Sequence, residues 1–153
     1  MADIDHRYMA PPFLRVMERR RGRHGDETLL WDLRVAQPNV SSMAMPAIHS
    51  VEHFLSTRLR ANSDNILAVA PMGCQTGFYI VTVNLTDREQ LSALLADALA
   101  EVLTSREVPL ADNVNCGWAL NHSLTGAQEI AEWLLRHRAR WHIPGVLEED
   151  GRA

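Results

Sequence analysis

The sequence contains no lysine, because all 15 of its basic residues are arginine. Schiff-base catalysis and a lysine-held pyridoxal phosphate both need a side-chain amine, so both are excluded. The phosphate-binding loop of the common NTPases also needs a lysine, and no Gly-rich dinucleotide fingerprint is present. With a formal net charge of −4, the chain lacks the basic surplus typical of proteins that bind nucleic acid, so no nucleic-acid partner is expected.

Long apolar segments are also missing. The longest apolar run extends only from Ile66 to Cys74, which is too short to cross a bilayer. Acidic residues follow Met1 closely, where a secretory signal would have basic and then apolar residues. We therefore expect a cytoplasmic protein with no membrane partner. The length fits one domain over 1–153, because no repeat or linker divides the chain.

Cysteine is scarce and histidine is plentiful. The two cysteines, Cys74 and Cys116, could form one disulfide at most. In a cytoplasmic chain they are expected to stay reduced and to serve metal binding or catalysis. The seven histidines are many for this length, so their spacing decides what they do.

The spacing of apolar residues predicts a mixture of strands and helices. Strand pairs occur together with helices without regular alternation, which favours an α+β fold in which an antiparallel sheet packs with helices. Thr86 and Thr125 are the expected caps of the later two helices. The expected strands are 13–17, 28–35, 65–70 and 78–85, and the expected helices are 45–60, 87–102 and 126–137.

The strongest chemical signal is the sequence His49-Ser50-Val51-Glu52-His53 within the first predicted helix. Residues three and four apart share a helix face, so both imidazoles can point at one ion with Glu52 beside them. This is the H-x-x-E-H arrangement of inverted zinc-peptidase motifs. Two neutral imidazoles suit zinc or ferrous iron, and the carboxylate can act as a general base.

A catalytic metal site needs a third protein ligand and an open position. Cys116 is one candidate, since Asn115 and Gly117 beside it indicate a turn. Glu129, in the last predicted helix, is the other and is the ligand that a peptidase would use. Spacing alone leaves both candidates open, because a buried cysteine is often an inert small hydrophobe.

Three further residues have both a functional and a structural interpretation. Cys74 has a glycine close on each side, which allows a tight turn that presents its sulfur, but it could also be a buried cysteine at the start of a strand. Arg34 could hold an anionic substrate group or form a surface ion pair with Asp32. His122, just before the last helix, is expected to be structural.

Together these segments resemble the S-ribosylhomocysteine lyase (LuxS) family. The most specific match is Pro-Met-Gly-Cys-Gln-Thr-Gly-Phe at 71–78, which follows His-Ser-Val-Glu-His at 49–53 and precedes Cys116-Gly117. Asp-Leu-Arg at 32–34 and Asp-His at 5–6 also match. The order and approximate spacing hold over nearly the whole chain, from about residue 5 to residue 135.

The resemblance implies an α/β sandwich of the type shared with inverted-motif metallopeptidases, and a homodimer with active sites at the subunit interface. It implies cleavage of S-ribosylhomocysteine to homocysteine and 4,5-dihydroxy-2,3-pentanedione, the autoinducer-2 precursor used in quorum sensing. One divalent ion per subunit is implied, Fe²⁺ in the native state and often Zn²⁺ as isolated. The implied roles are metal ligation by His49, His53 and Cys116, acid/base catalysis by Glu52 and Cys74, and substrate contacts by His6 and Arg34.

The chain departs from the family pattern where the substrate is held. Ala68-Val69-Ala70 replaces the usual Asp-x-Ser, Met1 stands where a serine is expected, and Ser123 replaces an acid. A pocket that has lost hydrogen-bond partners for hydroxyl groups should prefer a less polar ligand. The alternatives to the family reaction are therefore related metal-assisted chemistry on another substrate, or a non-catalytic metal-binding domain.

Overall fold

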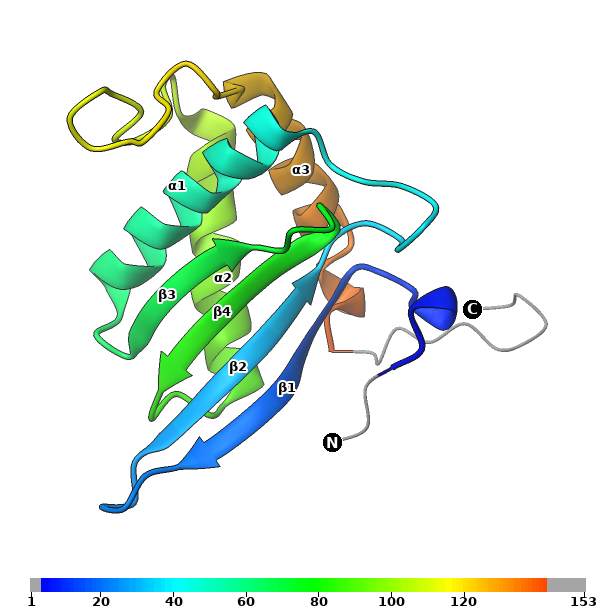
Figure 1. Cartoon of the computed structure of the whole chain (residues 1–153), viewed down its shortest axis with the longest axis vertical. Coiled ribbons are helices and arrows are strands. Elements are labelled where there is room, and N and C mark those ends of the chain that lie inside the picture. The colour runs from blue at the N-terminus through cyan, green and yellow to red at the C-terminus, as the bar shows by residue number, and fades with distance from the viewer. Residues whose placement is uncertain (1–3, 143–153) are drawn as a thin grey trace.

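The computed structural model describes residues 4–142, and within them three α-helices pack against a four-stranded antiparallel sheet (Figure 1). The strand order is β1-β2-β4-β3, which confirms the predicted α+β fold. No helix in this part of the chain is both long and apolar enough to cross a membrane. The elements are β1 (Phe13–Arg21), β2 (Glu27–Arg34), α1 (Met45–Asn62), β3 (Ile66–Pro71), β4 (Gly77–Val83), α2 (Arg88–Thr104) and α3 (Leu124–Arg136), with short 3₁₀ helices at His6–Tyr8 and Arg138–Arg140.

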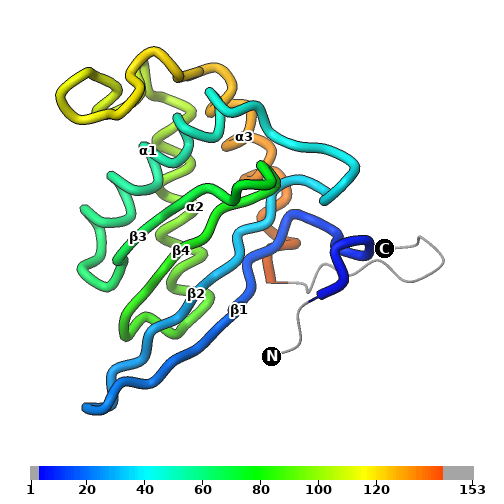
Figure 2. The backbone as a smooth tube through the Cα atoms, viewed as in Figure 1, coloured from blue at the N-terminus to red at the C-terminus, as the bar shows by residue number. Residues whose placement is uncertain are grey.

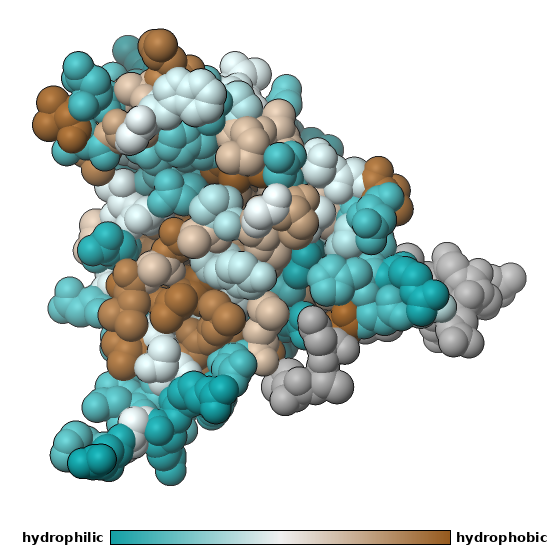
Figure 3. Space-filling view, viewed as in Figure 1, coloured by the Kyte–Doolittle hydropathy of each residue, from teal (hydrophilic) through white to brown (hydrophobic). Residues whose placement is uncertain are grey.

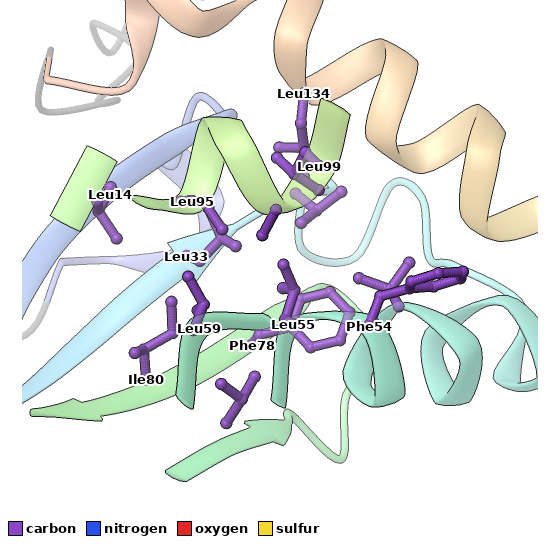
Figure 4. Packing of buried hydrophobic residues seen from close by; sticks show 14 of the residues in the cluster. Leu14, Leu33, Phe54, Leu55, Leu59, Phe78, Ile80, Leu95, Leu99 and Leu134 are labelled. Carbon is purple, nitrogen blue, oxygen red and sulfur yellow. The ribbon is translucent and has the colours of Figure 1, made fainter. Parts of the chain in front are cut away.

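The core lies between the sheet and the helices, which all lie on one side of it (Figures 1 and 2). Alternate residues of a strand point to opposite faces, so Leu33 and Ile80 face the helices and are fully buried. Leu55 of α1 and Leu99 of α2 meet them from the helical layer (Figure 4). This burial positions α1, which bears the histidine motif, firmly on the sheet.

The opposite face of the sheet is not covered by a helix. Leu30 of β2 and Val81 of β4 are direct cross-strand partners on that face, and both are half-buried. Ala68 of β3 pairs with Val81 on the other side, and Leu67 beside it is 50% exposed. Figure 3 shows apolar side chains gathered over this part of the sheet. Contiguous exposed apolar surface of this kind marks interaction sites.

The sequence predicts that one face of β2 is exposed, but the C-terminal end of β2 is buried on both faces. Asp32 and Arg34 occupy the open face, yet their side chains are 0% and 2% exposed. Arg34 donates from Nε and Nη2 to the Asp32 carboxylate at 3.1 and 2.9 Å, and Arg15 adds a contact at 3.3 Å. The interpretation as a surface ion pair is therefore wrong, since the pair is buried.

The predicted threonine caps are also wrong, each by one or two residues. Helix α2 is capped by Asp87, whose carboxylate accepts from the Glu89 N–H at 2.9 Å. Helix α3 is capped by Ser123, whose hydroxyl accepts from the Gly126 N–H at 3.0 Å. Asp and Ser are both stronger N-caps than threonine, and each supplies the oxygen at the actual helix start.

One glycine is required by the close approach of two strands. A Cβ built on Gly77 would stand 2.5 Å from the Leu33 carbonyl oxygen and 3.2 Å from the Arg34 Cα. Any side chain here would push β4 away from β2. The glycine therefore keeps the 71–77 turn next to the buried Arg34.

A candidate metal centre and a separate thiol site

Helix α1 presents His49 and His53 on one face, as the spacing predicts. The Nδ1 atom of His49 lies 2.9 Å from the Asn121 carbonyl oxygen, and that of His53 lies 2.8 Å from the Pro109 carbonyl oxygen. Each Nδ1–H therefore donates to a backbone carbonyl, which fixes the tautomer and leaves the Nε2 lone pair free. Metal-binding histidines are commonly oriented by this kind of hydrogen bond.

Cys116 reaches these histidines from the loop between α2 and α3. Its backbone N–H donates to the Asp112 carbonyl at 2.9 Å, and the Asp112 carboxylate accepts from the N–H groups of Val114 and Asn115. This turn places the Cys116 sulfur 3.4 Å from the His49 Nε2 atom.

Glu129, the other candidate ligand from the sequence, is not grouped with the histidines. It is exposed on α3 and lines a cavity with Ile130 and Trp133. Among the described residues, the donor atoms that lie together come from His49, His53, Cys116 and His122. The coordination shell expected of a peptidase is therefore not the one that the fold assembles.

His122 is the member of this group that the sequence interpretation missed. Its Nε2 atom lies 3.5 Å from the Cys116 sulfur, and its ring stacks on that of His49 with centroids 3.9 Å apart. Burial and the neighbouring charges of His49 and His53 lower the pKa of His122 to about 4. Nothing in the local sequence signals this, because only the packing of the 110–123 loop on α1 brings the ring to Cys116.

These four residues, called the metal cluster below, have donor atoms within 4.8 Å of one another. Nitrogen and sulfur ligands bound to one tetrahedral ion stand roughly 3.3–3.6 Å apart. The Cys116 sulfur already has this separation from two imidazole nitrogens, at 3.4 and 3.5 Å. A thiolate with neutral imidazoles suits zinc or ferrous iron. The residues present therefore fit one divalent transition-metal ion.

Glu52 stands beside the metal cluster, as the motif predicts. Its Oε2 atom lies 4.0 Å from the His53 Nε2 atom, and both residues line a small hollow of about 160 Å³. Burial raises the pKa of Glu52, and the nearby charges of His53 and His49 oppose the shift. A carboxyl group with a raised pKa keeps its proton to a higher pH than a free one, which suits a group that gives and takes protons.

Cys74 lies in the turn between β3 and β4 and is exposed, so the alternative of a buried cysteine is wrong. Its sulfur is 3.0 Å from the Thr76 hydroxyl. That hydroxyl accepts from Arg34 Nη1 at 2.8 Å, so its own proton is free to point at the sulfur. Burial raises the pKa of Cys74, but the hydrogen bonds from Thr76 and the charge of Arg34 outweigh it, and the pKa is lowered overall.

A cleft of about 400 Å³ opens in front of this sulfur. Cys74 and Thr76 line it together with His6 and the 38–42 loop. The fold thus brings His6 to Cys74, although the two are far apart in sequence. Arg34 lies behind the cleft and contacts it through Thr76. We call Cys74, Thr76, Arg34, Asp32 and His6 the thiol site.

Glu52 and Cys74, the expected acid/base pair, line different cavities of the chain. Trp118, two residues after Cys116, is 64% exposed. Ala68 offers only a methyl group on the open sheet face, and Met1 lies outside the described residues.

Comparisons with known proteins agree with one another. A family model described as S-Ribosylhomocysteinase (LuxS) matches residues 2–144. An S-ribosylhomocysteine lyase of Dichelobacter nodosus is 46% identical over 139 residues, covering 91% of this chain and 90% of that protein. Proteins with the same description from Listeria monocytogenes and Oceanobacillus iheyensis are 44% and 42% identical, over 91% of this chain and 90–91% of their own lengths.

Proposed function

The chain belongs to the LuxS family, and on that basis we propose that it is a carbon–sulfur lyase that cleaves S-ribosylhomocysteine to homocysteine and 4,5-dihydroxy-2,3-pentanedione. The observation that carries this is the convergence of His49, His53 and Cys116 in a chain with this family match. A single LuxS-like domain over 1–153 is proposed, acting in the cytoplasm and supplying the precursor of the quorum-sensing signal autoinducer-2.

His49, His53 and Cys116 are the proposed metal ligands. When bound, the divalent ion supplies a Lewis acid that stabilises negative charge developing on substrate oxygen. The donor set supports iron or zinc, and we propose Fe²⁺ as the ion used in the cell, with Zn²⁺ as the alternative. The two ring orientations set by Pro109 and Asn121 are what this chain contributes to holding it.

The proton transfers are assigned to Glu52 and Cys74. Moving the carbonyl group along the sugar requires a proton to leave one carbon and another to arrive at its neighbour. The Cys74 thiolate removes a carbon-bound proton, and the Glu52 carboxyl group gives and takes protons on the other side. Once the ketone stands two carbons from sulfur, removal of the proton on the intervening carbon gives an enolate, whose electron pair becomes the C=C bond as sulfur leaves. The C–S bond then breaks, its electron pair stays on sulfur, and homocysteine leaves and is protonated.

His6 and Arg34 are the proposed substrate-contact residues. The position of His6 supports its role, since His6 lines the same cleft as Cys74. Arg34 is buried, and its side chain donates to Asp32 and Thr76. Its contribution from within one chain is therefore to keep the Cys74 sulfur ionised.

A homodimer with shared active sites is proposed because the two halves of the chemistry line different cavities of one chain. A second copy that covers the open sheet face would bury the apolar row that includes Leu30 and Val81. Mixing two inactive variants tests this. If one chain supplies the metal cluster and its partner supplies the thiol site, a mixture of Cys116→Ala and Cys74→Ala chains regains activity. No gain after exchange of subunits would contradict shared sites.

The function itself is tested by titrating free thiol released when the Fe²⁺-loaded protein is incubated with S-ribosylhomocysteine. We expect thiol release well above that of a Cys74→Ala control loaded with the same metal. Release no faster than the control would contradict the lyase reaction.

A related substrate is the second candidate, favoured by Ala68. An alanine methyl cannot pair with a hydroxyl group, whereas a polar residue at this position could. Ala68→Asp restores a carboxylate on the open sheet face. If the sugar is the true substrate and its hydroxyl groups are held elsewhere, this variant leaves the KM for S-ribosylhomocysteine within a few-fold. A large fall in KM would favour a different natural substrate.

A further inference from the structure

We propose that Arg15 is a positioning residue of the thiol site, which acts on the Cys74 sulfur through Asp32 and Arg34 and helps to keep that sulfur ionised. Arg15 lies on β1, and its side chain is 12% exposed. The proposal deepens the acid/base role proposed above for Cys74 and rests on it.

The register of the sheet places Arg15 beside the buried ion pair. Arg15 and Asp32 are direct cross-strand partners of β1 and β2, and the Nε atom of Arg15 donates to the Asp32 carboxylate at 3.3 Å. The guanidinium also stands over the Phe13 ring, with Cζ 5.9 Å from the ring centroid, a distance at which a cation is attracted to the ring. Phe13 is the cross-strand partner of Arg34. The Arg15 charge is therefore directed toward the end of the sheet where Arg34 lies.

The Asp32 carboxylate serves two guanidinium groups. Its Oδ2 atom accepts from Arg34 Nη2 at 2.9 Å and from Arg15 Nε at 3.3 Å, and its Oδ1 atom accepts from Arg34 Nε at 3.1 Å. The carboxylate is fully buried, so salt and water screen its interactions weakly. A carboxylate that binds two cations cancels the charge of Arg34 less fully than one held by Arg34 alone.

The remaining nitrogen of Arg34 reaches the thiol through one hydroxyl. Nη1 of Arg34 donates to the Thr76 hydroxyl at 2.8 Å, and that oxygen lies 3.0 Å from the Cys74 sulfur. A cation near a thiol favours its ionised form. Because Arg15 takes up part of the Asp32 charge, more of the Arg34 charge acts on Cys74.

Other ionisable groups near this network are few. His6 lines the cleft in front of the Cys74 sulfur, and Tyr79 of β4 is the second cross-strand partner of Asp32. The 35–43 segment bonds to the backbone of the Cys74 turn and contains no ionisable side chain. Variants of Arg15 keep His6 and Tyr79 in place, so a change in the ionisation of Cys74 among them reports on Arg15.

The test measures alkylation of Cys74 against pH in the metal-loaded protein, with the modified cysteine identified by peptide mass spectrometry. Arg15→Gln removes the charge at nearly constant length. We expect the midpoint of the profile to move to higher pH and the rate well below the midpoint to fall by about threefold, while the rate at high pH stays the same. This is less than the loss of a direct hydrogen bond to the sulfur would cause, because the charge acts through an ion pair.

Two further variants separate charge from structure. Arg15→Lys keeps a cation that can make one contact with Asp32, so its profile should stay close to that of the wild type. Arg19→Gln, which removes an exposed arginine of the same strand, is the matched control and should also leave the profile unchanged. A wild-type profile in Arg15→Gln, or a lysine profile equal to that of glutamine, would overturn the proposal. A lower rate at every pH with the same midpoint would show a change of access alone and would overturn it too.

The route through Asp32 is tested by combining variants. In an Asp32→Asn background the shared carboxylate is gone, so adding Arg15→Gln should no longer move the midpoint. An equal shift in both backgrounds would overturn this route. None of these measurements needs substrate. Failure of the wild-type protein to release thiol from S-ribosylhomocysteine would therefore count against the lyase reaction and leave the alkylation results standing.

Discussion

The metal cluster joins parts of the chain that are far apart, whereas the thiol site is organised around one short turn. The His49 and Cys116 donor atoms come from residues separated by 67 positions. The Cys74 sulfur and the hydroxyl that supports it are separated by two positions. The first depends on a loop docking on α1, and the second depends on a hairpin of the sheet.

The two regions also handle charge differently. In the metal cluster, three imidazoles and a thiol lie together, each histidine Nδ1 is bonded to a protein oxygen, and the Nε2 atoms of His49 and His122 lie beside the Cys116 sulfur. In the thiol site, the buried Arg34 is neutralised by Asp32. Arg34 also donates to the Thr76 hydroxyl, which in turn contacts the Cys74 sulfur. The first arrangement is completed by an added cation, while the second carries its cation as part of the chain. Losing residues from each should therefore have different consequences.

The largest expected effect is on bound metal, which a substitution in the metal cluster should remove and one in the thiol site should not. Cys116→Ala should lose both bound metal and lyase activity. Cys74→Ala should lose activity by about 10²–10⁴-fold, the usual contribution of an acid/base group, and should keep one metal ion per chain. Metal analysis of dialysed protein and thiol release measure the two quantities. Loss of metal from Cys74→Ala would contradict the claim that the thiol site takes no part in holding the metal.

The next effect concerns the stability of the thiol site. Asp32→Ala leaves Arg34, which is 2% exposed, with its buried charge uncompensated. We expect the free energy of unfolding to fall by about 3–5 kcal/mol, measured by urea denaturation. Arg136→Ala breaks the exposed ion pair with Glu132 and serves as the control, with an expected loss of about 0.5 kcal/mol or less. Similar losses in both variants would contradict a structural role for the buried pair.

A smaller effect tests how the Cys116 loop is held. Asp112→Ala removes the carboxylate that accepts from Val114 and Asn115. Metal affinity should fall by about 10-fold, since the ligand remains but its orientation loosens. Competition with a chelator measures this, and Asp97→Ala, at an exposed position of α2, should leave the affinity unchanged. An unchanged affinity in Asp112→Ala would mean that the loop is ordered by other contacts.

The smallest effect is on the ionisation of Cys74. Thr76→Val removes the hydroxyl that donates to the sulfur, so the pKa of Cys74 should rise and the thiolate should form only at higher pH. The alkylation rate below neutral pH should fall by about tenfold, because a hydrogen bond to a charged group contributes roughly 1.5 kcal/mol. Thr76→Ser keeps a hydroxyl and should retain the original pH profile. Identical profiles for valine and serine would contradict the role of the hydroxyl.

Much of the fold could be predicted because its signals are local. The alternation that buries Leu29, Trp31 and Leu33 and the helical spacing in α1 identify elements without any knowledge of their neighbours. The helix caps were wrong because Asp87 and Ser123 stand within two residues of the chosen threonines, and sequence alone does not say which oxygen meets the free N–H groups.

The site was predictable only where its residues share an element or a family motif. His49, Glu52 and His53 lie within one helical turn, so their spacing indicates a shared face. His122 carries no such spacing with them, and its closeness to Cys116 results from the 110–123 loop folding back on α1. The burial of Arg34 was missed for a similar reason, because polar residues on one strand face usually indicate solvent.

The most direct test of the account is X-ray absorption at the metal edge of the loaded protein. We predict one sulfur neighbour at about 2.3 Å, present in the wild-type and Cys74→Ala proteins and absent from Cys116→Ala. A shell without sulfur in the wild-type protein, or the same sulfur signal in Cys116→Ala, would contradict it.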